Sequence, residues 1–114
     1  MAKSNKPIFW SLFAAGGTLA AFLAPVLVLL FLLTALGHAP DLFSYAKLHA
    51  FAANWFGKLF LLVVITLFLW HAAHRLRVTL YDFGLRQDAV VAPLVYLVAA
   101  AGTILSVLYL LRIQ

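Results

Sequence analysis

The sequence contains no cysteine and no glutamate, so its acidic residues are the three aspartates Asp41, Asp82 and Asp88. Without cysteine the chain cannot ligate an iron–sulfur cluster through thiolates or form a disulfide. All three aspartates lie in connections between apolar runs, whereas ion-coupled transporters usually place an acidic residue at mid-membrane depth. The sequence also lacks a phosphate loop, a G-x-G-x-x-G motif and an H-E-x-x-H motif. These absences argue against transport and against an independent catalytic module.

Long apolar runs dominate what is present: 67% of the 114 residues are hydrophobic and 10% are charged. The runs cover about residues 8–36, 48–74 and 89–111, and each exceeds the ~20 helical residues that cross a hydrocarbon core. The first run is also longer than the ~7–15 apolar residues of a signal peptide, so we expect it to be retained. The sequence predicts an all-α membrane protein with three transmembrane helices, forming a single membrane-anchor domain over residues 1–114.

The basic residues are distributed unequally between the two sides of such a membrane protein. The amino terminus and the second connection hold Lys3, Lys6, Arg75, Arg77 and Arg86, whereas the other side holds Lys47 and Arg112, with Lys58 nearer to it. Because lysine and arginine concentrate in cytoplasmic connections, this predicts a cytoplasmic amino terminus and an outward carboxyl terminus. The net charge of +5 therefore indicates orientation in a membrane and not binding to nucleic acid.

Polar and aromatic side chains meet at the cytoplasmic ends of the first two expected spans. Trp10 opens the first span, and His74 with Arg75 closes the second. Antiparallel neighbours would bring these three residues to one depth at the edge of the hydrocarbon. An indole, a titratable imidazole and a permanent cation suit a lipid-soluble head group that exchanges protons, such as a quinone. Trp10, His74 and Arg75 are therefore the candidate quinone-binding residues.

Haem is the rival use for the histidines. His71 and His74 are three residues apart and lie on neighbouring faces of one helix, so they are poorly placed to ligate opposite sides of one iron. The first and third spans contain no histidine, and His38 and His49 belong to the opposite boundary. Haem shared with a partner protein stays open. Each candidate residue also has a plainer interpretation: an interfacial anchor for Trp10, a positive-inside residue for Arg75 and a hydrogen-bonded helix-end residue for His74.

Three stretches resemble a known family: residues 6–17 (Lys-Pro-Ile-Phe-Trp-Ser-Leu-Phe-Ala-Ala-Gly-Gly), residues 24–26 (Ala-Pro-Val) and residues 69–75 (Leu-Trp-His-Ala-Ala-His-Arg). They are similar to the family of fumarate reductase D subunits, the smaller of two hydrophobic anchors in the four-subunit bacterial quinol:fumarate reductase. The length and the spacing of the three spans agree over essentially the whole chain. The Phe-Trp and His-Arg motifs are fairly specific as a pair.

The resemblance implies a role in anaerobic respiration at the bacterial cell inner membrane. The two anchors of that complex, its C and D subunits, attach a flavoprotein carrying FAD and an iron–sulfur protein, and themselves lack haem. Menaquinol is oxidised near the cytoplasmic face, and electrons pass through the clusters to the flavin, where fumarate becomes succinate. The resemblance assigns Trp10, His74 and Arg75 to the quinol pocket, and it makes this chain a non-catalytic anchor that contacts lipid and the other three subunits.

Two features depart from the family pattern, and two other functions stay open. The family has further histidines after the His-Arg pair, where this chain has Leu76-Arg77-Val78, and His71 is additional. An anchor of succinate dehydrogenase also has three spans and a histidine near an Asp-Tyr pair, for which Tyr81-Asp82 gives some support. A structural small membrane protein without a cofactor would use the Gly16-Gly17 pair only for packing.

Overall fold

A computed structural model describes residues 6–114, apart from the side chains of Lys6 and Phe9. Within that range the chain forms α1 (Lys6–Ala35), the short 3₁₀ helix η1 (Asp41–Phe43), α2 (Tyr45–Ala53), α3 (Trp55–Asp82) and α4 (Asp88–Arg112), and no strand. Three of the helices, over Trp10–Ala35, Trp55–Asp82 and Asp88–Arg112, are long and apolar enough to cross a membrane. The prediction of an all-α membrane protein with three transmembrane helices is confirmed.

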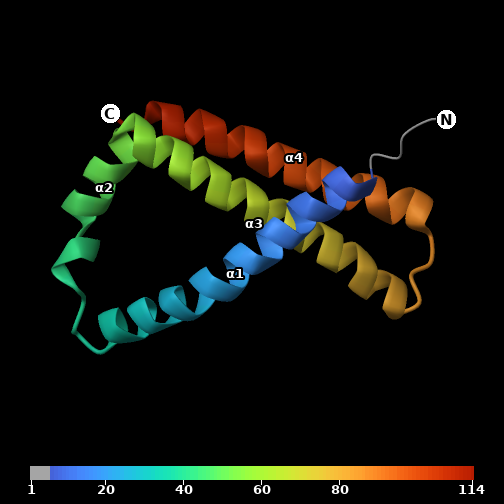
Figure 1. The fold of residues 1–114 in the computed structure, drawn as a ribbon, viewed down its shortest axis with the longest axis horizontal. Coiled ribbons are helices and arrows are strands. Elements are labelled where there is room, and N and C mark those ends of the chain that lie inside the picture. The colour runs from blue at the N-terminus through green and yellow to red at the C-terminus, as the bar shows by residue number, and fades with distance from the viewer. Residues whose placement is uncertain (1–5) are drawn as a thin grey trace.

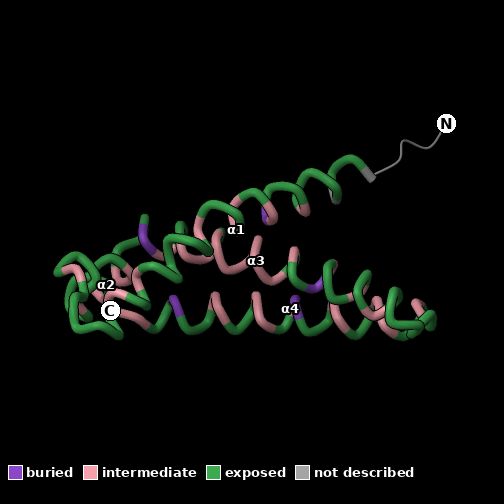
Figure 2. Tube along the Cα trace, turned by 90° about the horizontal axis from the view of Figure 1, so that it is seen from below, coloured by how far each residue is buried: buried purple, intermediate pink, exposed green. Residues whose placement is uncertain are grey.

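Helix α3 lies at the centre of the molecule and packs against both α1 and α4 (Figures 1 and 2). Helices α3 and α4 run antiparallel along one another, whereas α1 crosses α3 and then diverges from it (Figure 1). Small side chains occupy the α3–α4 contact, where Ala73 and Ala99 are buried. Because small residues let two helix backbones approach closely, they suit packing between helices in a membrane.

The second expected span, residues 48–74, differs from the structure because its helix is broken at Asn54. Asn54 has an extended backbone, and its side-chain oxygen accepts a hydrogen bond from the amide of Phe56 at 2.8 Å, which caps the start of α3. The preceding helix α2 folds back so closely that a Cβ on Gly57 would clash with the carbonyl oxygen of Phe51. The membrane-spanning helix therefore begins at Trp55 and extends to Asp82, beyond the expected end.

Glycines in the left-handed region end α1 and α3 in the same way. Gly37 has φ 80° and Gly84 has φ 95°, a conformation that costs glycine little because it has no Cβ. After α3, the amide of Gly84 donates to the carbonyl of Tyr81 and that of Leu85 to the carbonyl of Leu80, both at 3.0 Å. This paired pattern satisfies carbonyls that the helix end would leave without donors.

The two ends of the molecule carry different connections. The start of α1 and the α3–α4 connection lie at one end, and the carboxyl terminus lies beside the start of α3 at the other (Figure 1). The ammonium of Lys58 donates to the carbonyl of Ile113 at 2.7 Å, which places this lysine at the carboxyl-terminal end as predicted. Lys3 and the side chain of Lys6, part of the expected amino-terminal charge, lie outside the described residues, as does the side chain of Phe9.

Candidate functional site

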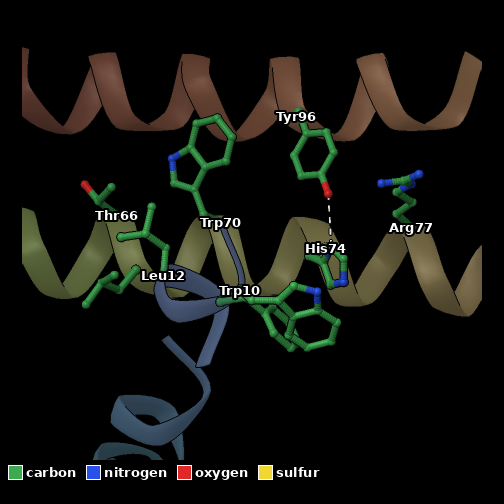
Figure 3. A pocket seen from close by; sticks show the side chains of 9 residues that line it. Trp10, Leu12, Thr66, Trp70, His74, Arg77 and Tyr96 are labelled. Carbon is green, nitrogen blue, oxygen red and sulfur yellow. Dashed lines mark hydrogen bonds between the residues drawn. The ribbon is translucent and has the colours of Figure 1, made fainter. Parts of the chain in front are cut away.

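A cavity of about 580 Å³ opens between the first turns of α1 and the facing sides of α3 and α4 (Figure 3). Its lining is mostly apolar and aromatic, with a few polar groups: Trp10, Leu12, Phe13, Thr66, Leu67, Trp70, His74, Arg77 and Tyr96. Volume and composition are those of a small-molecule site, in which apolar walls bury the ligand and a few polar atoms orient it. All three membrane-spanning helices contribute to it.

One wall of the cavity consists of aromatic rings from α1 that pack on His74. The centroids of the Phe13 ring and the His74 imidazole are 4.5 Å apart, with an interplanar angle of 60°. The indole of Trp10 packs edge-on against Phe13, with ring centroids 5.6 Å apart, and its centroid lies 6.3 Å from that of His74. Such edge-to-face pairs are favourable because the positive edge of one ring meets the negative face of another. Trp10 remains 63% exposed, so its face is open to a ligand or a partner.

The opposite wall joins α3 to α4. The rings of Trp70 and Tyr96 are stacked with centroids 5.9 Å apart and an interplanar angle of 19°. The indole nitrogen of Trp70 donates to the hydroxyl of Thr103 at 3.2 Å, and that hydroxyl donates to the carbonyl of Ala99 at 2.8 Å. These bonds satisfy the polar atom of an indole lying between apolar helices, and they hold the Trp70 ring in one orientation.

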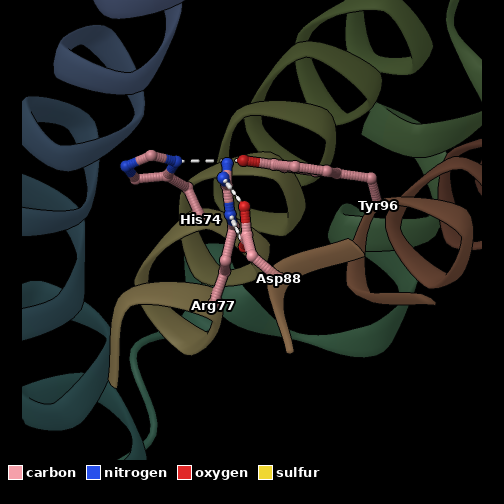
Figure 4. A network of polar contacts seen from close by, with 4 residues as sticks. All are labelled: His74, Arg77, Asp88 and Tyr96. Atoms are coloured by element: carbon pink, nitrogen blue, oxygen red, sulfur yellow. Dashed lines mark hydrogen bonds and ion pairs between the residues drawn. The ribbon is translucent and has the colours of Figure 1, made fainter. Parts of the chain in front are cut away.

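Polar contacts gather at the end of the cavity nearest the α3–α4 connection (Figure 4). The hydroxyl of Tyr96 and Nδ1 of His74 are hydrogen-bonded at 3.0 Å. The guanidinium of Arg77 lies 6.0 Å from the Tyr96 ring centroid. Arg77 also forms a two-pronged ion pair with Asp88, the first residue of α4, with Nε donating to Oδ1 at 2.7 Å. The cavity is therefore lined by a guanidinium that an ion pair holds in place and by an imidazole that a hydrogen bond orients.

Of the three candidate residues from the sequence, Trp10, His74 and Arg75, the structure brings only the first two together. Trp10 and His74 lie together and both line the cavity. Arg75 is exposed and is not among the lining residues. The arginine that lines the cavity is Arg77, which the sequence pattern indicated for membrane orientation alone.

Helical spacing is the signal that would have selected Arg77. Residues 66, 70, 74 and 77 follow one another at intervals of four, four and three, so Thr66, Trp70, His74 and Arg77 form one stripe along α3. Arg75 follows His74 directly and is turned by ~100° around the helix axis, since a helix has 3.6 residues per turn. For Tyr96 the signal is weaker: it is the aromatic residue with a polar tip within an otherwise apolar part of α4.

The histidines near the cavity have partners within the chain. Nδ1 of His71 lies 3.1 Å from the carbonyl oxygen of Phe13, and Nδ1 of His74 is bonded to Tyr96. Over the described part of the chain, no group of three histidine, aspartate or glutamate side chains is arranged to hold a metal ion. The geometry therefore presents His74 as a hydrogen-bonding group in an aromatic pocket.

Fold and site define a class: a small multi-pass membrane protein of three spanning helices, with an aromatic and basic pocket lined by all three. The family profile of the fumarate reductase D subunit matches residues 1–111. The chain belongs to this family of membrane-anchor subunits, and it is therefore part of a complex with other subunits.

Individual relatives agree over most of their length. The chain is 34% identical over 113 residues to the fumarate reductase D subunit of Aliivibrio fischeri, covering 97% of this chain and 94% of that protein. It is 34% identical over 114 residues to the corresponding protein of a Shewanella species, with 98% and 94% coverage. It is 45% identical over 107 residues to that of Mycobacterium bovis, with 89% and 82% coverage.

Proposed function

We propose that this chain is a non-catalytic anchor of quinol:fumarate reductase in the bacterial inner membrane and supplies part of the site that oxidises menaquinol. Together with the second hydrophobic anchor, the C subunit of the complex, it would attach a flavoprotein carrying FAD and an iron–sulfur protein to the cytoplasmic face. Electrons from the quinol would pass through the clusters to the flavin, where fumarate becomes succinate. The observation that carries this proposal is the aromatic pocket in which His74 is held by Tyr96.

The lining of the pocket fits the two parts of a quinol. Trp10 and Phe13 on one side and Trp70 and Tyr96 on the other provide aromatic walls for a flat ring. The side chains of Leu12 and Leu67 make part of the lining apolar, which suits an isoprenoid chain. The residues of α3 that line the pocket run from Thr66, near the middle of the helix, to Arg77 in its last turns, so the polar end of the pocket is the one nearer the α3–α4 connection.

His74 is the residue best placed to accept a proton. Oxidation of a quinol releases two electrons and two protons, so a group at the ring oxygen must take up a proton. When Nδ1–H of His74 donates to the hydroxyl of Tyr96, Nε2 carries the lone pair that can accept it. Tyr96 thereby fixes the orientation of the imidazole, and its hydroxyl, which can both accept and donate, is compatible with this tautomer.

Two arginines are candidates for holding the quinol oxygen. Arg77 lines the pocket and is held by Asp88, so its charge is positioned before a ligand arrives. Arg75 is exposed on the adjacent face of α3, and it would reach the quinol from the surface that partner subunits cover. We retain Arg75 as a proposed contact and add Arg77 from the geometry.

The distribution of charge supports a cytoplasmic position for this pocket. Arg75, Arg77 and Arg86 lie at the end of the molecule where α1 begins, whereas Lys58 and Arg112 lie at the other end. The positive-inside rule places the first group in the cytoplasm. An amino terminus on that side puts the pocket next to the face at which the iron–sulfur protein would dock.

The test compares two activities of the purified complex: reduction of fumarate by a menaquinol analogue and by a small soluble reduced dye that bypasses the pocket. His74→Leu should lower quinol turnover by about 100-fold or more, since a general acid or base contributes at least this much, and leave dye turnover intact. Parallel measurements on Arg75→Leu and Arg77→Leu decide which arginine contacts the quinol.

Trp55→Leu is the matched control, because Trp55 is 74% exposed at the start of α3, far from the pocket. It should leave both activities unchanged. If all variants lost quinol and dye turnover equally, the loss would reflect failed assembly of the complex and not a defect in quinol binding. Normal quinol turnover in an assembled His74→Leu complex would refute the assignment of the site.

A further inference from the structure

We infer that His71 is a positioning residue of this pocket: it fixes the rotation of α1 on α3 and thereby holds Phe13 and Trp10 against His74. The inference rests on the proposed function for its consequence in quinol binding, but its geometric part can be measured separately. His71 does not line the pocket itself. It acts through the backbone and the ring of Phe13.

The first observation is a hydrogen bond that crosses between two helices. Nδ1 of His71 on α3 lies 3.1 Å from the carbonyl oxygen of Phe13 on α1. The carbonyl is an acceptor only, so Nδ1 must carry the proton and donate it. A carbonyl oxygen has two lone pairs, so this bond can add to the helix's own bond. A directional bond of this kind selects one rotation of α1, which apolar packing alone specifies poorly.

The second observation is that α1 is shaped to receive this side chain. A Cβ on Gly17 would lie 2.8 Å from Cε1 and 3.2 Å from Nδ1 of His71, and a Cβ on Gly16 would lie 2.9 Å from Cβ of His71. The 2.8 Å and 2.9 Å distances are closer than real Cβ atoms approach other atoms, and the 3.2 Å distance is tighter than most real Cβ contacts. The Gly16-Gly17 pair therefore provides the flat surface on which the imidazole lies, as small residues do where helices cross in membranes.

The third observation links this contact to the pocket. The imidazole of His71 is stacked on the ring of Phe13, with centroids 4.6 Å apart and an interplanar angle of 15°. The same Phe13 ring contacts His74 at 4.5 Å and Trp10 at 5.6 Å. Phe13 is thus held between the two histidines of α3, and it supports Trp10 one turn earlier on α1. A shift at His71 reaches Trp10 through a single intermediate ring.

The crossing matters because α3 is the main neighbour of α1 within the described chain. After the crossing α1 diverges from α3 (Figure 1), so its later turns add little that would fix its rotation. The contacts of Gly16, Gly17 and Phe13 with α3 therefore determine where Trp10 points. A site that needs its groups within ~0.5 Å of the right position depends on such support.

Two substitutions at His71 distinguish the effect of its hydrogen bond from the effect of the volume that its side chain fills. His71→Leu removes both the donor and the ring. His71→Asn keeps a donor, because Nδ2 of asparagine sits at the position of Nδ1 in histidine. Loss of one hydrogen bond corresponds to about a five-fold effect, so His71→Leu should raise the KM for quinol about five-fold with little change in kcat. His71→Asn should recover most of that loss, and dye turnover should stay constant in both.

The direct readout is the environment of Trp10 in the full chain labelled with 5-fluorotryptophan. The chain has three tryptophans, and Trp10→Phe assigns the fluorine resonance of Trp10. We expect His71→Leu to shift or broaden this resonance, His71→Asn to return it toward the wild-type position, and the resonance of Trp55 at the far end to stay in place in both.

The outcomes separate the inference from the proposed function. A displaced Trp10 resonance together with a raised quinol KM, both rescued by His71→Asn, supports the inference. An unchanged Trp10 resonance in His71→Leu overturns it, and the quinol assignment then still stands or falls with His74→Leu. A displaced resonance with wild-type quinol kinetics overturns the role in quinol binding and counts against the pocket itself.

Discussion

The hydroxyl of Tyr96 on α4 lies 3.0 Å from Nδ1 of His74 on α3, so the two helices share a hydrogen bond in the wall of the pocket. The bond leaves one ring nitrogen of His74 for a ligand. It also makes the orientation of His74 depend on a residue of a different helix. The part of α4 around Tyr96 is otherwise apolar in sequence.

Tyr96→Phe should lower quinol-driven fumarate reduction by about five- to ten-fold, because it removes one hydrogen bond worth about 1 kcal/mol from the orientation of His74. The ring that stacks on Trp70 remains, so the assembly of the complex and dye-driven turnover should stay near wild type. Steady-state kinetics with both electron donors measure the effect.

Tyr109→Phe is the control for Tyr96→Phe. Tyr109 lies on the same helix, is 63% exposed, and has the guanidinium of Arg112 5.9 Å from its ring centroid at the other end of the molecule. It should leave quinol turnover unchanged. Equal effects of the two substitutions would mean that loss of any hydroxyl from α4 perturbs the complex, and the specific link to His74 would be lost.

The ion pair between Arg77 and Asp88 makes a second prediction, for stability. Both side chains are partly exposed, at 33% and 45%, so solvent screens the attraction and the contribution of the pair to stability should be small. Asp88→Asn should therefore lower the thermal midpoint of the complex by a few degrees. It should also raise the quinol KM, because the two-pronged bond that holds the guanidinium of Arg77 to the carboxylate of Asp88 is lost.

Asp41→Asn is the control for Asp88→Asn, because it tests whether removing any ion pair of the chain lowers the thermal midpoint and raises the quinol KM. Asp41 pairs with Lys47 in the first connection, where the two side chains are 85% and 50% exposed. We expect no measurable change in thermal midpoint or quinol KM. A wild-type midpoint in Asp88→Asn would show that the Arg77 pair contributes no more than this exposed pair.

The membrane spans could be predicted from hydropathy, but the break at Asn54 could not. Residues 48–74 are apolar enough to be one helix, and apolar character does not record where a backbone turns. The turn depends on local groups: the side chain of Asn54 replaces a helical hydrogen bond, and Gly57 lets the carbonyl of Phe51 approach. An asparagine followed three residues later by glycine is a weak signal inside an apolar run.

The candidate site was predictable in part. The antiparallel arrangement of the first two spans correctly places Trp10 beside His74, because helix ends on one side of a membrane share a depth. The choice between Arg75 and Arg77 required the angular position of each residue around α3. The contribution of Tyr96 required knowing which face of α4 packs on α3, and a helix that is apolar all round gives no such indication.

The glycines at the crossing of α1 and α3 make the third prediction. A Cβ on Gly16 would lie 2.6 Å from the carbonyl oxygen of Leu67 and 2.9 Å from Cβ of His71. Neither atom can move without its helix, so Gly16→Ala should push α1 off α3. Overpacking of this kind costs about 1–3 kcal/mol, which should lower the thermal midpoint of the complex and raise the quinol KM through displacement of Trp10.

Gly102→Ala separates this effect from the general consequence of adding a methyl group to a spanning helix. A Cβ on Gly102 would lie 3.1 Å from Cδ1 of Leu69, which is the far end of a flexible side chain and can move aside. Alanine also favours a helix over glycine by ~1 kcal/mol, so we expect no loss of thermal midpoint and no change in quinol KM. At Gly16 the same gain cannot offset a clash with the backbone of α3. If Gly16→Ala kept both the midpoint and the quinol KM of the wild type, the close crossing of α1 and α3 would be wrong, and with it the support that His71 gives to Trp10.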